Sequence, residues 1–329
     1  MFFIFLLLLV CLLRYKSAKP FTFQKYRSSV LKALFPYAII LGHISFHTEN
    51  PIILDFRYAG VYAVGLFFFM SGYGLESKHV VGDIRIESLL LRMRHLFTPL
   101  FLPLFLYLAI AYIKHISINT LIEYSINTFS FLLPFTWFVL ILCLLYIGYY
   151  FLRWYFSSNI FFNVAMLVYL LMLMIIFHLL GYDGTLYECN FSFLVGNMYK
   201  QNEQVIIRWI GKLFKGGEFC LLVAVLILLL ITLSYVSQKP IFRGFGLIGV
   251  SFYVFAFMIV FSYVKIENNL VISYLQKISY EVYLCQGIVF ILLSRNTTNI
   301  FIYSFMVICL DIVLATICYK ITKLLRCTE

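Results

Sequence analysis

Long apolar segments separated by short polar stretches run along almost the whole sequence. A helix that crosses the hydrocarbon core of a bilayer needs about 20 predominantly apolar residues. The pattern therefore predicts an all-α, polytopic transmembrane helical bundle with ten core spans, near 31–46, 58–76, 96–113, 134–152, 160–181, 186–199, 218–237, 247–264, 279–294 and 300–319. A shorter apolar run precedes them, so residues 1–30 are expected to form an anchor helix with a basic segment, and residues 31–329 the membrane domain.

The composition agrees with this class of protein. Of the 329 residues, 63% are hydrophobic and 12% are charged, and the mean hydropathy is +0.97. Soluble domains contain roughly 45–50% apolar and about 25% charged residues. The formal net charge of +11 does not indicate a nucleic-acid partner, because the basic residues flank apolar segments and form no basic stripe with interleaved aromatic residues. They are expected to contact membrane lipid instead.

The distribution of positive charge predicts the topology. If the spans alternate, the N-terminus lies outside, the C-terminus is cytoplasmic, and 20 of the 25 Lys and Arg residues fall on the cytoplasmic side. Such an excess is typical of cytoplasmic loops. The partly polar stretch 114–133 falls on the outer side, where it is expected to lie along the surface or to dip into the protein.

The first candidate chemistry lies in the first core span, where ionisable residues are costly and usually functional. Lys32 and His43 are eleven residues apart, which places them on one face of a helix and about 16 Å apart along it. That face offers a cation at the cytoplasmic surface and, deeper, a group that takes up a proton near neutral pH. A snorkelling lysine and a buried structural histidine would give the same pattern.

Metal and disulfide chemistry have weak support in the sequence. His47 follows His43 at the spacing of a zinc-binding pair, but no third ligand is evident. The eight cysteines form no CxxC pair, so neither a zinc site nor a disulfide framework is predicted.

Two further stretches near the cytoplasmic side contain candidate residues. The second core span carries Ser71 and Tyr73 among glycines, which permit close helix packing. Arg92 and Arg94 lead into the third core span. Arginine pairs well with phosphate groups, although simple anchoring of the cytoplasmic loop explains the same residues.

The remaining candidates are aromatic or intramembrane polar residues. Trp137 stands near the outer interface, where aromatic anchors are common. Tyr280 and Tyr283 open the ninth core span, with Gln286 one turn further on. Asp311 lies inside the tenth span and is expected to face the bundle interior with a partner.

Taken together, these pieces resemble the acyltransferase-3 family of bacterial membrane O-acyltransferases. The positions that carry the resemblance are Lys32 and His43; Phe67, Phe68, Phe69, Ser71, Gly72 and Tyr73; Arg92, Arg94 and Pro99; Trp137 and Phe138; and Ile278, Ser279, Tyr280, Tyr283 and Leu284. Three departures stand out, and one is the short anchor before the first core span, which is extra to the family pattern. The arginines are separated by one residue, where the family commonly has two, and Gln286 stands where the late motif usually ends in histidine.

The resemblance implies an enzyme of the bacterial cytoplasmic membrane. It would transfer an acyl group, most simply acetyl, from cytoplasmic acyl-CoA to a hydroxyl of a cell-surface or lipid-linked glycan, with no cofactor besides this co-substrate. By the same resemblance, His43 would act as general base or acyl carrier, and Lys32, Arg92 and Arg94 would bind the donor. The supporting residues would be Ser71, Tyr73, Trp137, Tyr280 and Tyr283.

The main alternative is a polytopic transporter or flippase for a lipid-linked glycan, without enzymatic activity. Such proteins line a central cavity with polar groups and often contain internal repeats. The sequence shows few intramembrane charges and no repeat, which favours the enzyme.

Overall fold

The computed structural model describes residues 25–46, 48–54, 56–57, 59–80, 85–213, 246–262, 270–293 and 299–327. The predicted anchor helix and the predicted span 218–237 lie outside these residues. The described helices, in chain order, are α2 (Lys25–Ser45), α3 (Pro51–Leu54), α4 (Ala59–Val80), α5 (Ile86–Phe97), the 3-10 turn η1 (Thr98–Leu100), α6 (Phe101–Ile113), α7 (Ile118–Asn127), α8 (Trp137–Tyr155), α9 (Asn159–Leu179), α10 (Thr185–Glu188), α11 (Phe191–Leu213), α13 (Gly246–Ser262), α14 (Leu270–Leu292) and α15 (Ile300–Cys327).

The prediction of an all-helical membrane protein is confirmed, because the described residues contain helices and no strand. Each predicted span except 218–237 overlaps one or more of the described helices. Six segments are long and apolar enough to cross a membrane: Ser28–Ser45, Pro51–His79, Ile86–Ile113, Trp137–Tyr155, Asn159–Leu179 and Ile300–Leu324. The count of ten spans is therefore not confirmed.

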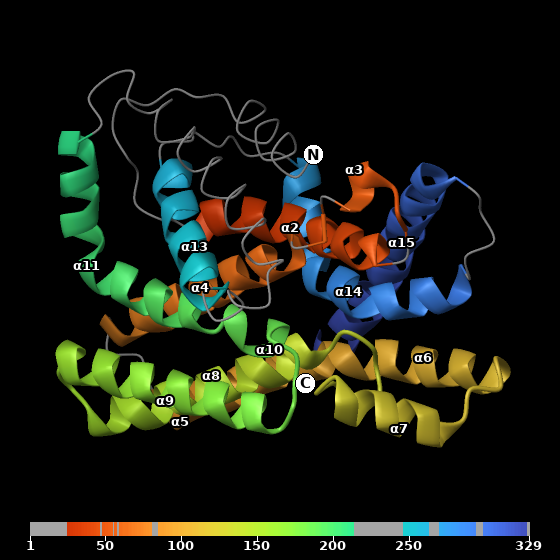
Figure 1. Ribbon diagram of the computed structural model, residues 1–329, viewed down its shortest axis with the longest axis horizontal. Coiled ribbons are helices and arrows are strands. Elements are labelled where there is room, and N and C mark those ends of the chain that lie inside the picture. Colours follow the sequence, from red (N-terminus) through yellow and green to blue (C-terminus); the bar gives the residue numbers. More distant parts are fainter. Residues whose placement is uncertain are drawn as a thin grey trace.

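The helices group into two sides that meet along the bundle (Figure 1). Helices α5, α8 and α9 lie along one side, with α6 and α7 beside them, and α2, α4 and α13 lie on the other side. Helix α2 packs against both α4 and α14, and α14 packs against α15. Helix α2 therefore packs both on a helix that follows it closely in sequence and on one more than 200 residues away.

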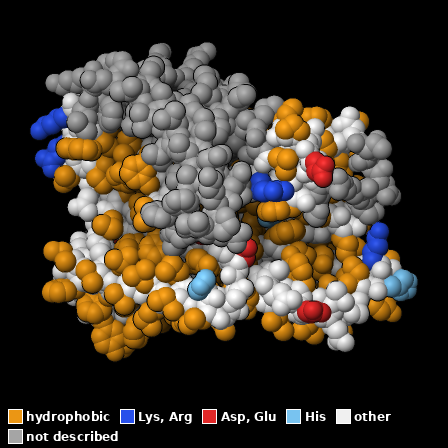
Figure 2. Space-filling model, viewed as in Figure 1, with side chains coloured by type: hydrophobic (Ala, Val, Ile, Leu, Met, Phe, Trp, Pro, Cys, Tyr) orange, Lys and Arg blue, Asp and Glu red, His pale blue; other side chains and the backbone are white. Residues whose placement is uncertain are grey.

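The outer surface of the bundle is apolar. Only 28% of the apolar window in α9 is buried within the protein, and Figure 2 shows hydrophobic side chains spread over much of the visible face. Soluble proteins rarely expose contiguous apolar patches of this extent. The protein is therefore a multi-pass membrane protein, and lipid covers these side chains.

Two glycines allow α4 and α11 to cross in close contact. A Cβ atom at Gly72 would overlap the carbonyl oxygen of Phe193, and one at Gly196 would overlap that of Phe69. Because lipid and leucine are equally apolar, close packing of small residues is a main source of helix association in membranes. This crossing fixes the position of α11 against α4. It therefore also sets how far along the bundle the later residues of both helices lie.

We expect Gly196→Ala to lower the free energy of unfolding by about 1–3 kcal/mol, because overpacking at a rigid backbone contact forces the helices apart. Thermal unfolding of the detergent-solubilised protein measures this change. Gly74→Ala is the matched control, since a Cβ at Gly74 meets nothing within 4 Å. Equal losses in the two variants would contradict the close crossing.

Candidate functional site

His43 lies in the last turn of α2 and faces the interior of the bundle. Its Nδ1 lies 2.9 Å from Oε1 of Gln286 in α14. Its ring stacks on that of Phe135, with centroids 4.0 Å apart and an angle of 19° between the planes. The imidazole is half-buried. The amide of Gln286 thus contacts one edge of the imidazole, and the Phe135 ring covers one of its faces.

Phe135 belongs to the segment between α7 and α8, and this segment enters the protein. It adopts a positive φ of 66°, which is uncommon for a bulky residue and is maintained only by its surroundings. The hydroxyl of Tyr283 donates a hydrogen bond to its carbonyl oxygen. The hydroxyl of Thr136 donates to the carbonyl of Leu133 at 2.7 Å and accepts from the backbone N–H of Phe131 at 2.9 Å. The ring beneath His43 is therefore held by a hydrogen-bonded turn.

The small size of Gly287 lets this turn approach α14. An added Cβ would lie 3.2 Å from Cβ of Pro134. The neighbouring side chain, Gln286, is fully buried, and its Nε2 donates to the carbonyl of Tyr283 at 2.9 Å. Tyr283 thus contacts the site twice, through its hydroxyl and through its carbonyl.

A second polar cluster lies around Tyr146 of α8. The guanidinium of Arg92 is 5.6 Å from the centroid of the Tyr146 ring, and the Tyr146 hydroxyl lies beside Ser71 and Arg92. The hydroxyl of Tyr280 donates to the carbonyl of Leu96 at 2.9 Å, and Tyr280 lies within electrostatic range of both Tyr146 and Tyr283. The structure therefore brings together Ser71, Arg92 and Tyr280, and Tyr280 lies near both Tyr146 of this cluster and Tyr283, which binds the turn under His43.

The two arginines do not share one face of α5. A separation of two residues corresponds to about 200° around a helix, and accordingly Arg92 is half-buried while Arg94 is exposed. Within the described part of the chain, Nε of Arg92 is buried without a hydrogen-bond acceptor. Lys32 is half-buried on α2, three helical turns before His43. Among the predicted donor-binding residues, Arg92 thus contacts Tyr146 in the cluster that includes Ser71.

Trp137 and Tyr73 take part in packing between helices. Trp137 packs at the edge of the main hydrophobic cluster, whereas the next residue, Phe138, meets Tyr283 with ring centroids 5.1 Å apart. The hydroxyl of Tyr73 donates to Glu203 of α11 at 2.8 Å. Tyr73 therefore contributes to the contact between α4 and α11.

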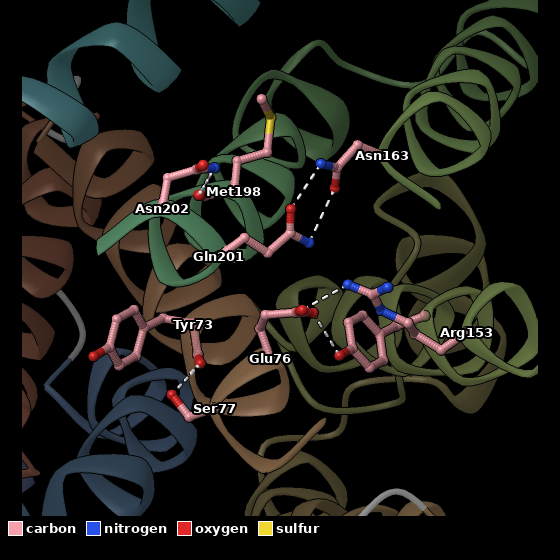
Figure 3. A network of polar contacts seen from close by, with 9 residues as sticks. Tyr73, Glu76, Ser77, Arg153, Asn163, Met198, Gln201 and Asn202 are labelled. Atoms are coloured by element: carbon pink, nitrogen blue, oxygen red, sulfur yellow. Dashed lines mark hydrogen bonds and ion pairs between the residues drawn. The ribbon is translucent and has the colours of Figure 1, made fainter. Parts of the chain in front are cut away.

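A buried ion pair lies one turn beyond Tyr73 (Figure 3). Nη2 of Arg153 donates to Glu76 at 2.6 Å, and the Tyr149 hydroxyl donates to the other oxygen of this carboxylate at 2.8 Å. The guanidinium of Arg153 lies 3.7 Å from the centroid of the Phe162 ring. The network joins α4 to α8 and α9, and both charged side chains are 1% exposed, so it is a structural element of the interior.

The interior position predicted for Asp311 is confirmed, because its side chain is fully buried. Among the described residues, neither carboxylate oxygen has a hydrogen-bond partner. Tyr37 of α2 lies within electrostatic range. His47, the other half of the candidate metal pair, lies outside the described residues.

Sequence reasoning missed the roles of Phe135 and Gln286. Gln286 was notable only because it replaces the expected histidine. The sequence does not indicate a positive φ at Phe135, because glycine or asparagine usually occupies such positions. Only the fold reveals that a phenylalanine stacks on His43.

Comparison with known protein families gives one match. A family model described as an acyltransferase domain matches residues 25–320, which include every candidate residue above. No curated protein and no solved structure matches the chain.

We expect Tyr283→Phe to lower the free energy of unfolding by about 1–3 kcal/mol, because the buried carbonyl of Phe135 loses its partner. Hydrogen exchange of residues 131–136 should accelerate in the same variant. Tyr274→Phe is the control on the same helix: its hydroxyl bonds to Thr316, away from the turn. Unchanged exchange in Tyr283→Phe would contradict the bond.

Glu76→Gln is expected to destabilise the protein by about 3–5 kcal/mol, because it leaves the buried guanidinium of Arg153 without its counter-charge. Thermal unfolding provides the measurement, with the exposed Glu87→Gln as control. Adding Arg153→Met should restore part of the loss, since the uncompensated charge is then removed. A double variant no more stable than Glu76→Gln would argue against the pair.

Proposed function

Because this chain belongs to the acyltransferase-3 family, we propose that it is a membrane O-acyltransferase with His43 at its reactive centre. Enzymes of this family transfer acyl groups other than amino-acyl groups. The proposed donor is a cytoplasmic acyl-CoA, most simply acetyl-CoA, and the proposed acceptor is a hydroxyl of a cell-surface or lipid-linked glycan. The family does not favour the transporter alternative.

The observation that carries this proposal is the pair of contacts that hold His43. Its imidazole lies between Gln286 and the Phe135 ring, and a fixed orientation of this kind supports a catalytic role. Histidine is the side chain most often used as a general base near neutral pH. Two routes use it. In direct transfer it takes the proton of the acceptor hydroxyl, and in the covalent route it carries the acyl group transiently.

Direct transfer balances without a further reactant. The acceptor O–H bond breaks, its proton goes to the imidazole, and the oxygen forms a bond to the thioester carbonyl carbon. The carbon–sulfur bond then breaks, and the CoA thiolate takes the proton from the imidazolium. The products are an ester and free CoA.

Arg92 is the proposed main contact for the donor, with Lys32 and Arg94 nearer the cytoplasmic surface. Its buried Nε has no acceptor among the described residues, and a phosphate oxygen would supply one. Ser71 and Tyr280 line the same cluster, and Tyr73, Trp137 and Tyr283 support the surrounding helices and turn. In this arrangement the acyl end of the donor passes Tyr280 toward His43. The proposed setting is the bacterial cytoplasmic membrane, with ten spans and a cytoplasmic C-terminus.

We expect His43→Ala to reduce acyl transfer by about 10²–10⁴-fold, the usual contribution of general acid–base catalysis. The assay combines purified protein, labelled acetyl-CoA and a panel of surface glycans, and it measures labelled product together with free CoA. His178→Ala, at the exposed end of α9, is the histidine control. Wild-type turnover in His43→Ala would exclude the proposed role, and absence of any transfer from thioester donors by the wild type would exclude the function.

A further inference from the structure

We infer that Gln286 is a positioning residue that holds neutral His43 in the tautomer with its proton on Nδ1, so that Nε2 is the nitrogen that exchanges protons with substrate. The assignment of the tautomer rests on contacts alone. Only the catalytic consequence rests on the proposed function.

The contact with Tyr283 fixes the orientation of the Gln286 amide. Oxygen and nitrogen of an amide differ in role, since the oxygen only accepts hydrogen bonds and the nitrogen donates them. One end of this amide lies 2.9 Å from the carbonyl oxygen of Tyr283, which only accepts. Turning the amide over would place two acceptor oxygens against each other at a fully buried position. The nitrogen therefore faces Tyr283, and the oxygen faces His43.

The orientation of the Gln286 amide determines which nitrogen of His43 carries the proton. The oxygen of Gln286 lies 2.9 Å from Nδ1 of His43, and a contact of this length between two acceptors would be repulsive. Nδ1 must therefore donate. A neutral imidazole carries one N–H, so the lone pair resides on Nε2. A backbone carbonyl in α14 thus dictates, through one amide, which nitrogen of a histidine in α2 is basic.

Phe135 restricts the plane of the His43 imidazole. Stacking on Phe135 at 4.0 Å restricts rotation of the imidazole about its bond to Cβ. Phe135 is in turn held by the Tyr283 hydroxyl. Tyr283 therefore acts on His43 through both paths, since its carbonyl orients Gln286 and its hydroxyl holds the stacked ring.

Nitrogen NMR of protein labelled with ¹⁵N-histidine tests the assignment directly. Nδ1 and Nε2 give distinct signals when protonated and when bearing a lone pair, and the His43 signals are identified by their loss in His43→Gln. We expect the wild type to show protonated Nδ1 and unprotonated Nε2. Gln286→Met, which removes the acceptor, should mix the two tautomers. Gln286→Glu should keep the proton on Nδ1 and add one on Nε2, because a carboxylate stabilises the imidazolium.

Activity provides the second measurement. In Gln286→Met we expect kcat to fall at least about tenfold, part of the contribution of a general base, with the KM for acetyl-CoA little changed. Gln286→Glu should also lose activity near neutral pH, because an imidazolium stabilised by the carboxylate cannot accept the proton of the acceptor. Gln276→Met, ten residues earlier on α14, is the matched control and should behave as wild type in both measurements.

Together, the NMR spectra and the activities test the tautomer assignment separately from the catalytic role of His43. A wild-type spectrum with the proton on Nε2, or identical spectra in the wild type and Gln286→Met, would overturn the role of Gln286. If His43→Ala is inactive, wild-type turnover in Gln286→Met would also overturn the positioning role of Gln286. If His43→Ala is fully active while the spectra behave as expected, the tautomer assignment holds and the proposed catalytic role of His43 fails.

Discussion

A chain surrounded by lipid must satisfy its backbone polar groups internally, and the site depends on how one non-helical segment meets this constraint. Residues 128–136 leave the helical ladder and enter the bundle, where unpaired N–H and C=O groups are costly. Ser125 donates to the carbonyl of Phe131 at 2.9 Å, Thr136 closes the turn, and Tyr283 binds the carbonyl of Phe135. Once these bonds are made, the position of the Phe135 ring is fixed, and with it the face on which His43 rests.

The polar residues of the interior separate into groups with different physical roles. Glu76, Arg153 and Tyr149 bond mainly to one another and join helices, so their charges are already compensated. Nε of Arg92 is buried without an acceptor in the described part of the chain, and so are Nε and Nη1 of Arg153. The two arginines differ in their counter-charge, because Glu76 neutralises Arg153 whereas Arg92 lies over the neutral ring of Tyr146. A guanidinium beside a neutral phenol keeps its charge for an anionic ligand.

Sequence reasoning accounts for the class of fold and for part of the site. Hydropathy identifies the membrane helices because lipid imposes their length and composition. Helical geometry predicts that Lys32 and His43 share a face, and it also explains why Arg92 and Arg94 cannot point to the same place. The remainder depends on contacts between distant segments. The pairing of His43 with Gln286 spans 243 residues, and the positive φ of Phe135 is imposed by tertiary packing, for which a phenylalanine in the sequence gives no sign.

The chemical nature of the partner at position 286 matters for the half-buried His43. A carboxylate there would stabilise the imidazolium strongly and would itself require compensation in a region with few positive charges. An amide provides a directional acceptor without adding charge, so the imidazole is oriented while its neutral form is not penalised. A general base must be neutral before it acts and must release the proton afterwards. A neutral partner whose own orientation is set by a backbone carbonyl satisfies both requirements, because the backbone of α14 carries no charge and does not titrate.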